Sequence, residues 1–240
     1  MTVSLRTPDG MGVSGGYDSL DDSEPAARTT FAYSRTIGVL VAATALAIAL
    51  IAVPNWPAGV FQDDGIYVIL GKALATGEGY RYLNLPGAPY ATHYPPGYPL
   101  FLALLWKVSP QFPQNVALFS FASAGFLALA AFGTFRFAHT RLGLSALGAG
   151  VVAIAGSVSM PAIIFGVFVL SEPMFMALLL PVLIYAERVS ERAGWRDALF
   201  VGLAGGALAM VRTTAMFVVP AFVLVLLFRR RFVPAVCALV

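Results

Sequence analysis

Two adjacent carboxylates, Asp63 and Asp64, are the first residues in the sequence whose type and spacing could do chemistry. One carboxylate can take a proton from an acceptor hydroxyl, while the other holds a metal ion or raises the pKa of its neighbour. Aspartate is also favoured at the N-cap and in the first turn of a helix, so helix capping is an alternative and compatible role. We therefore take Asp63 and Asp64 as candidate catalytic residues.

A histidine and a tyrosine open the proline-rich segment His93-Tyr94-Pro95-Pro96-Gly97-Tyr98-Pro99. Prolines restrict the backbone at the start of the helix that we expect to follow. His93 and Tyr94 would then be held as donors toward a phosphate at the helix N-terminus. An aromatic anchor at a membrane interface, followed by a turn, is the alternative interpretation.

Two charged residues, Glu172 and Arg212, interrupt long apolar segments. A charge in such a setting is costly and is usually functional. Arg212 is a candidate partner for a phosphate or a carboxylate, and Glu172 is a candidate for binding the substrate. The alternatives are a water-exposed loop glutamate and an arginine that snorkels to the interface. Asp64 and Glu172 also offer the oxygen ligands that a divalent cation prefers, although the sequence requires neither a metal nor another cofactor.

The composition indicates whether the protein that positions these residues is surrounded by water or by lipid. The chain has 240 residues, of which 59% are hydrophobic and 11% charged, whereas a soluble domain carries about a quarter charged residues. The net charge of +3 comes from short basic clusters between apolar runs, which is not the pattern of a nucleic-acid-binding protein. The single cysteine, Cys237, excludes a disulfide within the chain. The sequence therefore predicts a protein embedded in a lipid bilayer.

The first span is expected at residues 36–53, after a polar segment, residues 1–35, that is typical of a disordered cytoplasmic tail. Nearly all the conspicuous polar chemistry follows in a long outer loop, about residues 55–115. Two amphipathic stretches in this loop, residues 63–76 and 97–108, are too short to span a bilayer. We expect both to be helices that lie in the membrane interface.

Basic clusters determine the expected number of crossings. Arginines gather at residues 136–141, 188–196 and 229–231, and such clusters favour the cytoplasmic side. An even number of spans must separate two cytoplasmic clusters, so residues 198–228 are predicted to be a short helix pair that turns at residues 212–214. The other spans are predicted at residues 116–135, 142–170 and 174–186.

The sequence thus predicts an all-α, multi-pass plasma-membrane protein with about six transmembrane helices. Residues 36–240 would form the membrane domain. The final segment, residues 232–240, is typical of the start of another span, so we expect the chain to be truncated at its C-terminus. Because the basic clusters are expected in the cytoplasm, the candidate residues are all expected at the extracytoplasmic face: Asp63, Asp64, His93, Tyr94, Glu172 and Arg212.

These motifs, in this order, resemble a known family. Asp63-Asp64-Gly65-Ile66-Tyr67 follows the first expected span, and His93 to Leu100 comes about thirty residues later. Leu170-Ser171-Glu172-Pro173 and a glycine-rich span ending in Arg212 complete the pattern. The arrangement resembles the N-terminal half of GT-C-type glycosyltransferases, above all the protein O-mannosyltransferases and the aminoarabinose transferases that modify lipid A.

The resemblance implies an enzyme that moves a sugar from a polyprenyl-phosphate carrier to an acceptor on the far side of the membrane. Asp63 matches the first acid of the family motif, which implies a base or an acceptor-orienting residue. Asp64 stands at the second position, where the family usually has glutamate. Tyr94 stands where the aminoarabinose branch has a lysine, so His93 and Arg212 are the expected phosphate partners. The acceptor, which can be a glycan, a lipid or a protein, is not specified by the resemblance.

Two other functions compete with this hypothesis. A transporter or flippase for a lipid-linked or small polar solute predicts broken helices and polar residues near the bilayer midplane. An arginine at position 212 inside one continuous span would favour that alternative. A non-catalytic membrane scaffold gives no reason for acids, a histidine and an arginine to gather at one face.

Overall fold

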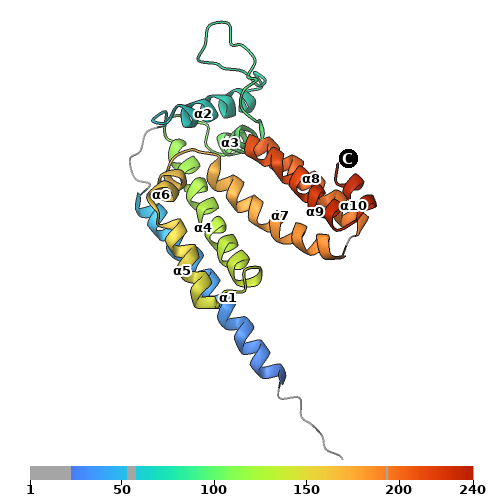
Figure 1. Ribbon diagram of the computed structural model, residues 1–240. Helices are drawn as coiled ribbons and strands as arrows, with labels where there is room; N and C mark the ends of the chain where they lie inside the picture. Colours follow the sequence, from blue (N-terminus) through green and yellow to red (C-terminus); the bar gives the residue numbers. More distant parts are fainter. Residues whose placement is uncertain (1–22, 53–57, 193, 240) are drawn as a thin grey trace, which may run out of the picture.

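The computed structural model describes residues 23–52, 58–192 and 194–239, which Figure 1 shows as a bundle of helices with a smaller helical layer across one end. Within these residues, strand-like pairing is limited to an isolated bridge between Arg81 and Tyr90. The expected all-α architecture is therefore confirmed for the described part of the chain.

Three helices are long and apolar enough to cross a membrane: residues Ala32–Ala52 of α1 (Ser23–Ala52), α4 (Val116–Thr140) and α7 (Glu172–Arg192). Their lengths match the roughly 20 residues that a bilayer crossing needs. Helix α1 begins at Ser23, inside the segment expected to be a disordered tail, whereas residues 1–22 lie outside the described residues. The helices of this protein are those of a membrane protein.

Two helices joined at a sharp bend occupy residues 142–170, where one span was expected. Helices α5 (Ala146–Ser157) and α6 (Met160–Val167) are bent by 65° at a short break. Pro161 lies in the first turn of α6, where it has no N–H for a continuous helical ladder and its ring would clash with the preceding turn. The bent pair is a fourth candidate span if its two halves cross the membrane together.

The helix pair expected at residues 198–228 consists of α8 (Trp195–Val211), a 3-10 helix η1 (Thr213–Phe217) and α9 (Val218–Phe228). The break falls at Arg212, whose backbone is extended (φ −151°, ψ 131°). The η1–α9 arm is apolar but shorter than the three long helices, and α8 has 17 residues. The count of about six spans therefore remains a prediction. A short helix, α10 (Phe232–Cys237), follows α9.

Helix α4 lies at the centre of the bundle, next to α1, α5, α6 and α7 (Figure 1). Small residues let its neighbours approach closely. A Cβ on Gly38 of α1 would lie 2.8 Å from the Phe135 ring, and one on Gly133 of α4 would lie 3.0 Å from Leu180 of α7. Close packing through glycine is typical of helices in a membrane, where burial in lipid removes the hydrophobic drive for association.

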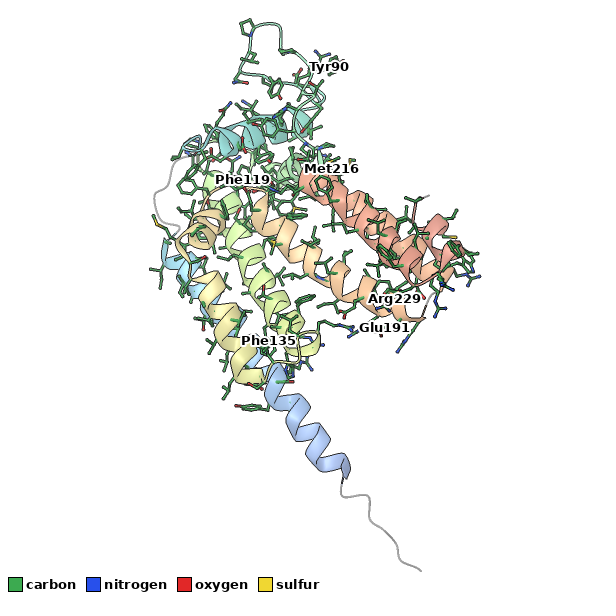
Figure 2. The ribbon with its side chains drawn as sticks, in the orientation of Figure 1. Tyr90, Phe119, Phe135, Glu191, Met216 and Arg229 are labelled. Carbon is green, nitrogen blue, oxygen red and sulfur yellow. The ribbon has the colours of Figure 1, made fainter. Side chains whose placement is uncertain are left out.

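Helices α2 (Gln62–Ala75) and α3 (Gly97–Val108) form the layer across the end of the bundle (Figure 1). They occupy the two stretches in which short helices were expected. A Cβ on Gly97 would lie 2.6 Å from the Met210 carbonyl oxygen, so the start of α3 touches the end of α8. A hydrophobic cluster packs this layer against α4 and α8, and it includes Tyr67, Tyr98, Trp106, Phe119 and Val211. Figure 2 shows Phe119 just beneath this layer and Phe135 toward the opposite end of α4.

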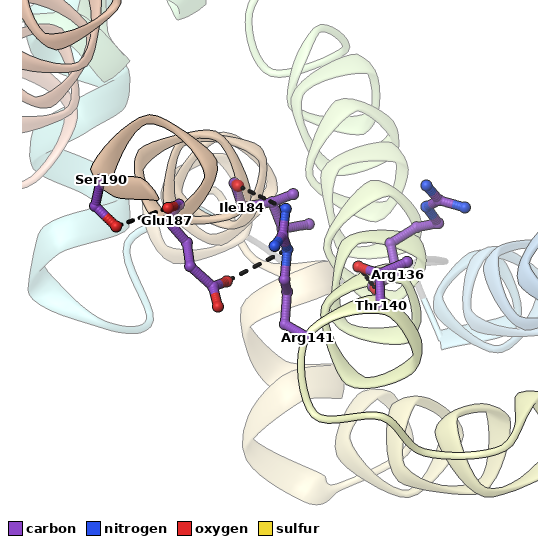
Figure 3. Close-up of polar contacts among 6 residues, drawn as sticks. All are labelled: Arg136, Thr140, Arg141, Ile184, Glu187 and Ser190. Carbon is purple, nitrogen blue, oxygen red and sulfur yellow. Dashed lines mark hydrogen bonds and ion pairs between the residues drawn. The ribbon is translucent and has the colours of Figure 1, made fainter. Parts of the chain in front are cut away.

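An ion pair joins α4 and α7 at the end of the bundle away from this layer (Figure 3). Arg141 Nε lies 3.3 Å from Glu187 Oε2, and Arg141 Nη2 donates to the Ile184 carbonyl oxygen at 3.3 Å. The pair holds α7 beside α4 at the end of the bundle away from α2 and α3, and α8 then runs back toward that layer (Figure 1).

Candidate functional site

A cavity of about 220 Å³ lies where α2, the segment before α3 and the turn after α8 meet. Four of the six residues predicted for the site line it: Asp63, His93, Tyr94 and Arg212. Three other cavities among the described residues are lined mainly by alkyl and aromatic side chains. The complete lining is Asp63, Tyr67, His93, Tyr94, Pro95, Arg212, Thr213 and Thr214.

Asp63 is an exposed carboxylate in the first turn of α2. Tyr94 Oη donates a hydrogen bond of 2.7 Å to Asp63 Oδ1. Burial, and then this hydrogen bond, raise the pKa of Tyr94, so the phenol keeps its proton and acts as the donor. The bond connects α2 to the segment that precedes α3 and leaves Asp63 facing the cavity as a hydrogen-bond acceptor.

Asp64 is fully buried and does not line the cavity. Its Oδ2 accepts hydrogen bonds from the N–H groups of Gly59 (2.8 Å) and Val60 (3.2 Å), and its Oδ1 accepts one from Gly65 (2.8 Å). A carboxylate satisfied by backbone N–H groups fixes the chain that leads into α2. The two adjacent acids therefore have different surroundings, one in the cavity and one in the loop.

Arg212 and Glu172 form an ion pair behind the cavity. Arg212 Nη1 lies 3.0 Å from Glu172 Oε1, with the side chains 32% and 20% exposed. Glu172 is the first residue of α7, where a negative charge is favoured by the helix dipole. The second oxygen, Glu172 Oε2, is buried and has no hydrogen-bond partner among the described residues. Glu172 thus supports Arg212 and does not itself line the cavity.

His93 is exposed and its ring packs edge-to-face against Tyr94, with 5.1 Å between the ring centroids. Tyr80 Oη donates to the carbonyl oxygens of Tyr94 (2.9 Å) and Pro95 (3.3 Å). These bonds, and the restricted backbone of the prolines, hold the His93–Tyr94 segment at the cavity.

Ser171 and Tyr67 are site residues that the sequence-based candidates did not include. Ser171 is fully buried; its Oγ accepts a hydrogen bond from Arg212 Nη1 (3.1 Å) and lies 3.1 Å from Tyr67 Oη. Tyr67 lies four residues after Asp63, and that spacing puts both side chains on one face of α2. This spacing could have indicated Tyr67, whereas no sequence signal distinguishes Ser171 from other serines next to an acid.

The two residues considered for a divalent cation, Asp64 and Glu172, are engaged by other groups. Both Asp64 oxygens accept backbone hydrogen bonds, and Glu172 Oε1 pairs with Arg212. In the described part of the chain, no group of three or more histidine, cysteine, aspartate or glutamate side chains is placed to hold a metal ion. The cavity instead combines one acid with cationic and hydroxyl donors.

The arrangement defines a class of site: a polar cavity at one end of a bundle of membrane-type helices, able to bind an anion and to accept a proton. No protein-family profile matches the chain. Neither a curated protein nor a solved structure is significantly similar to it. The functional argument therefore depends on the site itself.

Proposed function

We propose that this protein is a membrane glycosyltransferase that moves a sugar from a polyprenyl-phosphate carrier to an acceptor hydroxyl on the extracytoplasmic side. The observation that carries the proposal is that Asp63 and Arg212, which are far apart in the sequence, line one cavity. A proton acceptor and a cation in one cavity are what displacement of a phosphate by a hydroxyl requires.

The reaction is a direct displacement at the anomeric carbon. The acceptor oxygen forms a bond to this carbon while the bond between the carbon and the phosphate oxygen breaks. The acceptor proton passes to Asp63, and the bonding electron pair stays with the departing phosphate. Arg212 and His93, which line the same cavity, stabilise the negative charge that grows on the phosphate. Tyr94, by donating to Asp63 Oδ1, orients the base.

The distribution of charge supports the proposed orientation. Arg188, Arg192 and the run Arg229–Arg231 are exposed, and Figure 2 places Glu191 and Arg229 at the end of the molecule away from Tyr90 and Met216. Basic clusters favour the cytoplasm, so the cavity faces the opposite side of a multi-pass plasma-membrane protein. With the bent α5–α6 pair, α8 and η1–α9 each counted as a span, the chain crosses about six times. The carrier's prenyl chain lies between these spans.

The broken α5–α6 pair supports a second candidate function, a flippase for the lipid-linked sugar. Discontinuous helices often line transport pathways, and an apolar cavity of about 200 Å³ beside the break includes Glu172 in its lining. A continuous helix through Arg212 would have favoured this candidate more strongly, but α8 ends there. Movement of a fluorescent polyprenyl-phosphate sugar across vesicles without its consumption would identify the flippase.

The transferase is tested with membranes that contain the full chain and a panel of radiolabelled polyprenyl-phosphate sugars. Transfer is followed into the lipid, glycan and protein fractions. Asp63→Asn should lower the rate about 100-fold or more, the usual contribution of a general base. Glu78→Gln, which changes an exposed acid outside the cavity, is the matched control and should keep the wild-type rate. A wild-type rate in Asp63→Asn at equal expression would refute the mechanism.

A further inference from the structure

Ser171 is a buried hydroxyl held between a cation and a phenol. Its Oγ lies 3.1 Å from Arg212 Nη1 and 3.1 Å from Tyr67 Oη, and the residue is 0% exposed. In the described part of the chain, these two groups are the partners of its side chain. Ser171 therefore links the turn after α8 to α2 through a single oxygen.

The chemistry of the three groups determines the direction of the hydrogen bonds. A guanidinium has only donors, so Ser171 Oγ accepts from Arg212. If Tyr67 also donated to Ser171, the serine proton would be buried without an acceptor, and buried polar groups are rarely left unpaired. Ser171 therefore donates its proton to Tyr67 Oη, and the proton of Tyr67 is not used in this contact.

We propose that the Tyr67 hydroxyl is a second hydrogen-bond donor, beside Arg212, for a phosphate oxygen in the cavity, and that Ser171 is the positioning residue that turns it there. Tyr67 lines the cavity together with Asp63 and Arg212. The proposal rests on the proposed function only in taking a phosphate as the ligand.

Two further observations support Tyr67 in this role. Burial, the largest cause, raises the pKa of Tyr67, and the nearby acids Asp63 and Glu172 add to this effect, so the phenol remains a donor at neutral pH. The ring is clamped edge-to-face against Tyr94 and Tyr98, with centroids 5.4 Å and 5.0 Å away. A donor fixed before the ligand arrives needs no reorganisation when negative charge develops on the leaving phosphate.

The test measures binding of farnesyl monophosphate, with farnesol as the uncharged control, to the purified full chain in nanodiscs. Tyr67→Phe removes the hydroxyl and keeps the ring, and should weaken farnesyl monophosphate binding about tenfold, as expected for a hydrogen bond to a charged group. Ser171→Ala should have a similar effect. The double variant should have about the same affinity as the single variant that binds less tightly, because both changes remove the same donor, the Tyr67 hydroxyl. Farnesol binding should not change in any of them.

Tyr98→Phe is the matched control, because Tyr98 is buried in the same aromatic cluster, faces Ser123 at 3.5 Å and does not line the cavity. It should bind farnesyl monophosphate as the wild type does. The inference is overturned if Tyr67→Phe binds like the wild type while Arg212→Ala loses binding, or if Tyr67→Phe weakens both probes equally. If Arg212→Ala has no effect, or if the wild type binds both probes equally, the phosphate site of the proposed function fails and the inference fails with it.

Discussion

Arg212 Nη1 lies 3.0 Å from Glu172 Oε1, so the residue that directly follows α8 is paired with the residue that begins α7. The pair neutralises Arg212 in part and, with Ser171, fixes the guanidinium at the cavity wall. Leaving Arg212 without its carboxylate would leave a half-buried cation without a counter-charge.

Glu172→Gln should lower the free energy of unfolding by about 1–2 kcal/mol, which is less than for a fully buried pair because both side chains are partly exposed. Denaturation followed by circular dichroism in detergent measures the change. Glu187→Gln is the control, since Glu187 pairs with Arg141 at 3.3 Å but is 42% exposed, and it should cost less than about 1 kcal/mol. Equal losses of stability in the two variants would contradict the larger contribution expected from the more buried Glu172–Arg212 pair.

Asp64→Ala should destabilise the protein by about 1–3 kcal/mol, because the N–H groups of Gly59 and Val60 lose their acceptor. Asp63→Ala should leave stability nearly unchanged, since Asp63 is exposed and, among the described residues, accepts one side-chain hydrogen bond, from Tyr94. Parallel thermal melts of the two variants make the comparison. A larger loss of stability in Asp63→Ala than in Asp64→Ala would show that the two roles are reversed.

Gly97→Ala should separate α3 from the end of α8, because the new Cβ would lie 2.6 Å from the Met210 carbonyl oxygen, a backbone atom that cannot rotate away. We expect a loss of about 1–3 kcal/mol in stability together with lower transfer, since His93 and Arg212 lie on opposite sides of this contact. Gly206→Ala, with no atom within 4 Å of its Cβ, should be neutral or stabilising by up to about 1 kcal/mol. Similar melting temperatures for both variants would argue against a tight α3–α8 contact.

The orientation in the membrane can be measured by cysteine labelling in a Cys237→Ala background. Glu78→Cys and Thr214→Cys, both at exposed positions, should react with an impermeant maleimide on intact cells. Glu191→Cys, exposed at the far end of the molecule (Figure 2), should react only after the cells are opened. If position 214 reacts only after the cells are opened, as position 191 should, while position 78 reacts on intact cells, the turn after α8 and the outer loop lie on opposite sides of the membrane. That result would exclude a shared site.

The helices were largely predictable because apolar run length is a local property of the sequence. The helices at residues 62–75, 97–108 and 116–140 fall close to the expected ranges, and the break at Arg212 lies in the expected turn. The bend of 65° within residues 142–170 was not predicted, because hydropathy does not register the missing N–H of Pro161, and whether the bent pair crosses the membrane as one span stays a prediction. Whether α8 and η1–α9 cross the membrane depends on a lipid boundary, and that stays a prediction.

Four of the six candidate residues could be grouped at one end of the molecule from the sequence, but their contacts could not be predicted. Sidedness suggested that Asp63, His93, Tyr94 and Arg212 share one end of the molecule, and all four line one cavity. Ser171 could not be recognised, because its importance comes from Arg212 and Tyr67, which are distant in the sequence and adjacent only after folding.

By itself, the sequence determined the class of the protein: apolar runs long enough for a bilayer, separated by basic clusters and by one polar segment that contains Asp63, Asp64, His93 and six tyrosines. Only the tertiary structure decided which of two neighbouring aspartates faces the cavity. Adjacent residues on a helix point about 100° apart, so Asp63 and Asp64 cannot both face it, and the packing of α2 on α3 selects Asp63. The pairing of Glu172 with Arg212 has the same origin, since it depends on how α7 and α8 are placed and not on either residue's neighbours in the chain.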